Sequence, residues 1–141
     1  MLKSHGTEQR GGYVRSQIVI SNNEIDSPAV EEPDFFLAFS LAAYNAYCSL
    51  VREGIILYDP AYVTIDETLP IKQLAIPAKE LAIEKLGKEL FSNSIMLGAA
   101  TRVTGFFDPK NMLQALLDII PKSKDKNREG FEIGLNLDCG R

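Results

Sequence analysis

Near the amino terminus, the segment Ser4–Gly12 reads SHGTEQRGG and combines glycines with charged side chains. Glycine adopts positive φ without strain, so Gly11 and Gly12 allow consecutive backbone N–H groups to converge on an anion. Arg10 adds a planar guanidinium, which can bind a phosphate or a carboxylate through two parallel hydrogen bonds. One interpretation of the segment is therefore a phosphate cradle.

Two other interpretations of the same segment rest on its charged side chains. Glu8 and His5 can in principle exchange protons with a substrate, but no nucleophile or metal ligand accompanies them at a suitable spacing. Glu8 and Arg10 can instead pair with each other or with a neighbouring subunit, while the glycines let two backbones approach. We favour this docking interpretation, because charged pairs are more often structural than catalytic.

A second group of candidate residues follows the predicted strands. Asp59 precedes Pro60 at the end of an apolar run, and open α/β sheets bind ligands at the carboxyl ends of their strands. Turn chemistry alone favours the simpler interpretation of Asp59 as a turn residue. Tyr44, Tyr47 and Tyr58 have a spacing that fits core packing with the hydroxyl at the rim.

The residues that usually bind metals are sparse in this sequence. There are two cysteines, Cys48 and Cys139, without a CxxC pair, and one histidine, His5. Iron–sulfur clusters and structural zinc sites require a full set of thiolate or imidazole ligands. We therefore expect no metal site on this chain, both cysteines reduced, and Cys48 buried in a helix of small residues.

Composition and charge exclude several classes of protein. The 141 residues are 45% hydrophobic and 24% charged, as in soluble domains, and the net charge of −4 argues against nucleic acid as the main partner. The basic cluster Lys122–Arg128 is expected to be a solvated loop between two helices. No apolar run approaches the roughly 20 residues that cross a membrane, and the start does not resemble a secretory signal, so we expect a cytoplasmic protein.

Hydrophobic periodicity predicts four strands. Val14–Ser21 alternates, with Val14, Ser16, Ile18 and Ile20 on one face and Arg15, Gln17, Val19 and Ser21 on the other, and is predicted to be a strand that buries one of these faces. Residues 4–12 before it are predicted to be loop. Three short apolar runs are predicted to be strands, of which the first two are buried: Asp34–Ser40, Gly54–Pro60 and Ile71–Pro77.

Helices are predicted between and after these strands. They cover residues 41–54, 78–87, 92–105, 108–120 and 127–141. Gly54 and Gly87 are the expected C-terminal stops, Ser92 or Asn93 and then Asp108 the expected N-caps. The small residues at 98–100 are expected to let another backbone approach closely.

Short strands that alternate with helices indicate the α/β class, with a Rossmann-like open, mostly parallel sheet flanked by helices. No linker or repeat divides the sequence, so we expect a single domain over residues 1–141. Sheets of this kind usually open with a strand, a Gly-rich turn and a helix, and neither G-x-G-x-x-G nor GxxxxGK[ST] occurs here. We therefore expect a domain that is truncated at its amino terminus.

Several segments resemble, in order, the motifs of one family. SHGTEQRGG resembles the S-[YH]-G-x-E-x-R-G-G segment of the gamma subunit, or gamma domain, of 2-oxoacid:ferredoxin oxidoreductases. VISNNEIDSP is similar to its V-x-I-S-x-x-x-I-x-S-P stretch, and PDFFLAFSLAAYNAY to its P-D strand that leads to A-Y-x-x-Y. IPAKELAIEKLG is similar to V-P-A-x-E-I-A-x-E-L-G, and NSIMLGA to N-M-V-x-L-G-A. The family's leading strand and G-x-G-G-Q-G turn do not occur in this sequence.

The resemblance implies an accessory, non-catalytic subunit of an enzyme that oxidatively decarboxylates a 2-oxoacid, forms an acyl-coenzyme A and passes electrons to ferredoxin. It implies alpha and beta subunits, in some cases delta, as partners. Thiamine diphosphate with Mg and the [4Fe–4S] clusters then belong to other chains, and this chain alone binds no cofactor. Glu8, Arg10, Gly11 and Gly12 would contact either the phosphates of coenzyme A or a partner subunit. Pyruvate, 2-oxoglutarate and ketoisovalerate remain open as substrates.

The alternatives are a free-standing Rossmann-like regulatory module that binds a nucleotide or coenzyme A, and a homo-oligomeric fragment without activity. The absent Gly-rich first turn counts against the regulatory module, because that turn is what cradles the phosphates.

Overall fold

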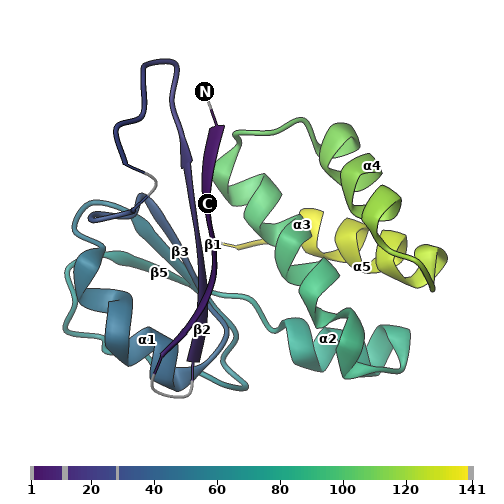
Figure 1. The fold of residues 1–141 in the computed structure, drawn as a ribbon. Helices are drawn as coiled ribbons and strands as arrows, with labels where there is room; N and C mark the ends of the chain where they lie inside the picture. The colour runs from purple at the N-terminus through teal and green to yellow at the C-terminus, as the bar shows by residue number, and fades with distance from the viewer. Residues whose placement is uncertain (1, 11–12, 28, 140–141) are drawn as a thin grey trace. The chain divides into compact units, whose positions relative to one another are not determined.

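The computed structural model describes the backbone of residues 2–10, 13–27 and 29–139, and the side chains of residues 14–27 and 29–139 (Figure 1). The chain divides into two compact units. The first unit comprises Met1–Ile56 and Tyr62–Gln73, and the second comprises Leu57–Ala61 and Leu74–Arg141. The single domain expected over residues 1–141 stays a prediction.

The first unit opens with a β-hairpin. Strand β1 (Leu2–Arg10) pairs antiparallel with β2 (Tyr13–Ile20), with a bulge between His5 and Glu8. The prediction that the segment before β2 is a loop is therefore wrong for its backbone up to Arg10. A Gly-Gly pair between two strand-like runs is a hairpin signal, and it was present in the sequence.

Three parallel strands form the second sheet, in the order β3 (Phe35–Ala38), β4 (Ile55–Tyr58) and β5 (Lys72–Ala75). The N–H of Ile55 donates to the carbonyl of Asp34 over 2.9 Å, and the N–H of Ile76 donates to the carbonyl of Tyr58 over 2.7 Å. These two bonds join the starts of β3 and β4 and the ends of β4 and β5. Neighbouring strands therefore run in the same direction, and the predicted parallel sheet is confirmed. The predicted full burial of β3 is wrong, since Phe35, Phe36 and Leu37 at this edge of the sheet are half-buried.

A short helical crossover joins β3 to β4. Helix α1 (Leu41–Tyr47) begins after Ser40, whose hydroxyl accepts a hydrogen bond from the Ala43 N–H, and it continues as the 3-10 turn η1 (Cys48–Leu50). Gly54 is not the helix stop that we expected, because the chain is already extended at Val51. A Cβ at Gly54 would overlap the Asp34 carbonyl, so this glycine lets the start of β4 lie against the start of β3.

The second unit is a set of helices whose ends largely follow the sequence signals. Helix α2 (Ala78–Leu86) ends at Gly87 with φ 80°, and α4 (Pro109–Ile119) starts behind Asp108, whose carboxylate accepts from the N–H groups of Lys110 and Asn111. Both caps confirm the predictions. After the 3-10 turn η2 (Glu89–Phe91), helix α3 (Ser92–Thr104) starts without a side-chain cap from Ser92 or Asn93, where we had expected one.

The last helix, α5 (Lys124–Leu135), packs along α3. A Cβ at Gly98 would overlap the Phe131 carbonyl, and one at Gly134 would overlap the Ile95 carbonyl, so the two backbones meet through glycines. This confirms the close approach expected at residues 98–100. The basic cluster at residues 122–128 is largely the exposed start of α5 and not the loop that we predicted.

Candidate functional site at the ends of β4 and β5

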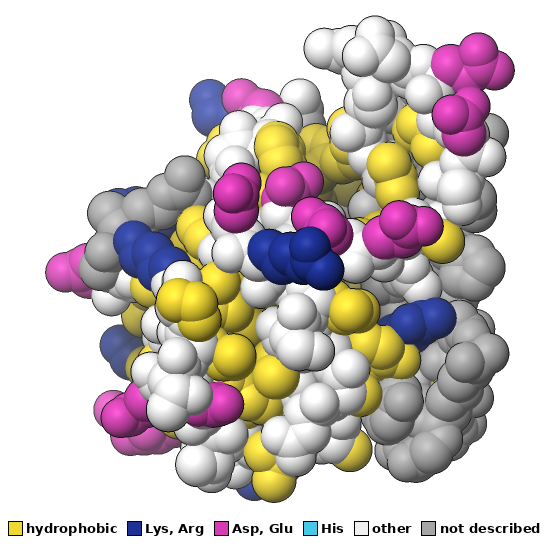
Figure 2. All heavy atoms as spheres, turned by 90° about the vertical axis from the view of Figure 1, so that its left-hand side faces the viewer, with side chains coloured by type: hydrophobic (Ala, Val, Ile, Leu, Met, Phe, Trp, Pro, Cys, Tyr) yellow, Lys and Arg dark blue, Asp and Glu magenta, His cyan; other side chains and the backbone are white. Residues whose placement is uncertain are grey.

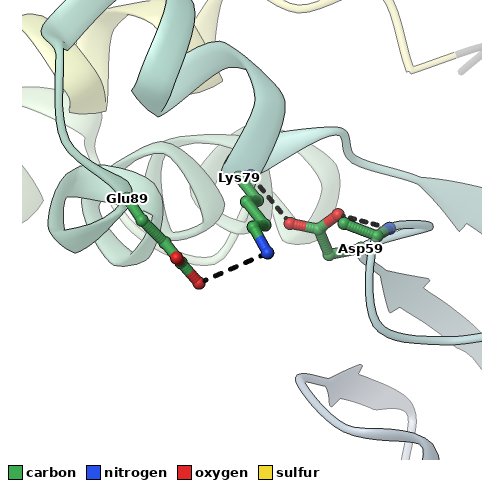
Figure 3. Close-up of polar contacts among 4 residues, drawn as sticks. Asp59, Lys79 and Glu89 are labelled. Atoms are coloured by element: carbon green, nitrogen blue, oxygen red, sulfur yellow. Dashed lines mark hydrogen bonds and ion pairs between the residues drawn. The ribbon is translucent and has the colours of Figure 1, made fainter.

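Asp59 is the first residue after β4, and its side chain is buried, with 2% of its surface exposed. One carboxylate oxygen, Oδ1, accepts a hydrogen bond from the Ala61 N–H over 2.9 Å. The other, Oδ2, accepts from the Lys79 N–H over 2.8 Å, at the start of α2 (Figure 3). The carboxylate thus joins the end of β4 to the amino terminus of the next helix.

This geometry decides what the amino terminus of α2 can bind. The first N–H groups of a helix lack partners within the helix and attract anions. Pro77 precedes α2 and gives no side-chain cap, and the Asp59 carboxylate takes that place. A phosphate would compete there with a negative group already hydrogen-bonded by both oxygens. The turn role expected for Asp59 is confirmed, and its capping role was not visible in the sequence because Lys79 lies 20 residues away.

Lys79 also points its ammonium toward Glu89 at the start of η2 (Figure 3). The Nζ–Oε1 distance is 3.8 Å, and the two side chains are 34% and 51% exposed. At this distance and exposure the pair contributes little to stability. The side chains around Asp59 thus form a structural connection and not an arrangement of acid, base and nucleophile.

Tyr44 forms a second polar centre, inside the first unit. Its hydroxyl donates to Gln73 Oε1 over 2.6 Å and accepts from the Asp66 N–H over 2.9 Å, and the Gln73 amide donates to the Asp66 carbonyl. Burial raises the pKa of the Tyr44 hydroxyl above its usual value. Hydrogen bonds from Thr68 lower the pKa of the Asp66 carboxyl. Tyr44 is a core residue with its hydroxyl bonded, as predicted, and it ties α1 to the loop before β5.

Tyr47 contacts the hairpin. The Arg15 guanidinium lies 5.0 Å from the centre of its ring, and Phe36 meets the ring edge-on at a centroid distance of 6.2 Å. On the same face of β2, Gln17 Oε1 accepts a hydrogen bond from the Val30 N–H over 2.7 Å. These contacts hold β2 against the rest of the first unit through polar side chains.

Residues 4–10 contribute their backbone to strand β1 of the hairpin. Glu8 lies opposite Arg15 in the register, and Arg10 lies opposite Tyr13. The side chains of Glu8, Arg10 and His5, and the residues Gly11 and Gly12, lie outside the described part of the structure. Whether they cradle a phosphate or dock a subunit therefore stays a prediction.

Two shallow grooves occur on the surface, one in each unit. In the second unit, a groove of about 400 Å³ runs between α2 and α5, lined in part by Leu81, Lys85 and Glu132. In the first, one of about 340 Å³ lies beside η1, lined in part by Val51, Arg52 and Leu69. Neither combines buried polar groups in the way that small-molecule pockets do.

The two cysteines are only partly buried. Cys48 is half-buried and not fully buried as predicted, and it is a free thiol like Cys139, whose pKa is raised by burial. Among the described residues, no group of three His, Cys, Asp or Glu side chains is placed to hold a metal ion. Within residues 2–139, apart from the gaps, no helix has the length and apolar character to cross a membrane.

Figure 2 shows a band of acidic side chains across one face, with basic side chains standing singly among them.

The fold and these contacts define an α/β module with a parallel sheet, whose buried polar groups among the described residues are engaged in structural hydrogen bonds. A family model described as pyruvate ferredoxin/flavodoxin oxidoreductase matches residues 1–137. The chain belongs to this family.

Curated relatives agree with this assignment. A 2-oxoglutarate synthase subunit KorC from Methanocaldococcus jannaschii is 35% identical, over 96% of this chain and 74% of the relative. A ketoisovalerate oxidoreductase subunit VorA from Methanothermobacter marburgensis is 37% identical, over 72% of this chain and 22% of the relative. A pyruvate synthase subunit PorC from the same organism is 28% identical, over 91% of this chain and 73% of the relative.

Solved structures share the fold. The gamma subunit of a keto/oxoacid ferredoxin oxidoreductase from Geobacter sulfurreducens superposes with a TM-score of 0.81 at 24% identity, over 94% of this chain and 75% of that one. A 2-oxoglutarate:ferredoxin oxidoreductase from Magnetococcus marinus, solved with 2-oxoglutarate, coenzyme A and succinyl-CoA, gives a TM-score of 0.77 at 19% identity. It aligns with 98% of this chain and 26% of that one. The predicted α/β class and the family resemblance are thereby confirmed.

Proposed function

We propose that this chain is the gamma subunit of a 2-oxoacid:ferredoxin oxidoreductase whose substrate is 2-oxoglutarate. The observation that carries the substrate is the set of relatives named as 2-oxoglutarate synthase subunits, which are 30% to 35% identical over 96% of this chain. Subunits named for pyruvate are 28% identical. The ketoisovalerate subunit is similar in identity but matches less of the chain.

The role that fits this chain within such a complex is accessory. The carboxylate of Asp59 and the hydroxyl of Tyr44 are both engaged in hydrogen bonds that hold the fold together, which favours a structural role over a catalytic one for each. The chain has two cysteines, fewer than an iron–sulfur cluster requires, and they supply no cluster by themselves. Other subunits would hold thiamine diphosphate and the clusters, and would donate electrons to ferredoxin. We place the assembled complex in the cytoplasm.

We assign the segment around Glu8 and Arg10, with Gly11 and Gly12, to a subunit interface. The alternative role is contact with the phosphates of coenzyme A. Replacing Arg10 with Ala should then weaken assembly with the partner subunits more than it weakens coenzyme A binding to the complex. Two measurements on the same preparation separate these roles: the affinity of the chain for the partner subunits, and the affinity of the complex for coenzyme A. A selective loss of coenzyme A affinity would assign Arg10 to the phosphates.

The test of the proposed function is reconstitution. The chain is co-expressed with the alpha and beta subunits encoded in its genome, and the purified complex is assayed for coenzyme A-dependent reduction of ferredoxin. We expect turnover with 2-oxoglutarate to exceed turnover with pyruvate or ketoisovalerate by at least tenfold, and to fall when this chain is omitted. A chain that never co-purifies, or that changes no activity, is incompatible with the proposal. Preference for another 2-oxoacid would refute the substrate alone.

A further inference from the structure

We draw no further inference here: the strongest candidate, the groove between α2 and α5 that is lined in part by Leu81, Ile133 and Leu137, presents apolar side chains, and nothing in the structure shows what covers them.

Discussion

Asp59 and Tyr44 are buried polar side chains whose partners are distant in sequence. The Asp59 carboxylate accepts two backbone N–H groups, and the Tyr44 hydroxyl both donates and accepts. A buried polar group that loses its partner retains the cost of leaving water. Each of these two side chains therefore stabilises the fold, because it supplies a hydrogen-bond partner to groups that would otherwise be left without one.

Replacing Asp59 with Asn should lower the free energy of unfolding by about 2 kcal/mol, because an amide can accept one of the two N–H groups but presents its own N–H to the other. Urea unfolding of the purified chain measures the change. Asp26→Asn is the matched control at an exposed position, with an expected change within about 0.5 kcal/mol. Equal effects of the two substitutions would refute the capping role of Asp59.

Replacing Tyr44 with Phe should cost about 1–2 kcal/mol near neutral pH, since Gln73 and the Asp66 N–H lose the hydroxyl. This difference should shrink as the pH rises. The pKa of the hydroxyl is raised in the folded chain by burial, so the parent binds its proton more tightly when folded. Its contribution is complete below the unfolded pKa of about 10 and is lost as the pH rises through the folded pKa. Unfolding of both proteins at pH 8 and at pH 11 tests this, and a constant difference would contradict it.

At the scale of elements, the contact of α3 with α5 depends on the absence of side chains. Gly98 and Gly134 each face a backbone carbonyl of the opposite helix. Glycine within a helix costs roughly 1 kcal/mol relative to Ala in helix propensity. The close packing of the two backbones offsets that cost at Gly98 on α3 and at Gly134 on α5.

Gly134→Ala should therefore destabilise the chain by about 2–3 kcal/mol, because its Cβ would overlap the Ile95 carbonyl and force the helices apart. Gly130→Ala in the same helix is the control. Its Cβ would lie 3.2 Å from Leu86 Cδ1, a movable side-chain end, and the expected change is within about 1 kcal/mol. Thermal unfolding compares the two. If Gly130→Ala proves the more damaging change, the backbone contact at Gly134 is not what limits the packing.

For the whole molecule, the question is how the chain assembles with its partner subunits. The net charge of −4 and the acidic band of Figure 2 could be taken to indicate an electrostatic interface. Val14, Ile18 and Ile20 on β2 are exposed and uncharged, so an interface that buries them would be apolar. These two kinds of interface respond differently to salt.

The affinity of the chain for its catalytic partner should change by less than about threefold between 0.1 M and 0.5 M NaCl, since salt screens exposed charges but not apolar burial. Sodium sulfate should strengthen the complex. The test is to measure equilibrium binding of the chain to its catalytic partner over a range of NaCl and of sodium sulfate concentrations. Weakening of more than about tenfold in NaCl would show that charges dominate the interface.

The sequence was sufficient for the α/β class, for most helix boundaries and for the family, because these depend on local signals. Asp108 followed by Pro109 marks a helix start through groups within three residues, and Gly87 marks an end through its own φ. The small residues at 98–100 likewise indicated a close approach. The ordered motifs were confirmed by the family match over residues 1–137.

Other features were decided by tertiary structure, because they depend on residues far apart in sequence. Alternation in β2 defines two faces but not which of them is buried, and that was settled by Tyr47 and Val30. Asp59 reads as a turn residue until Lys79 is brought beside it. The sequence by itself determined what kind of module this is, since periodicity and caps act within a few residues. Only the tertiary structure decided which side chains hold the module together and which apolar face it leaves outside.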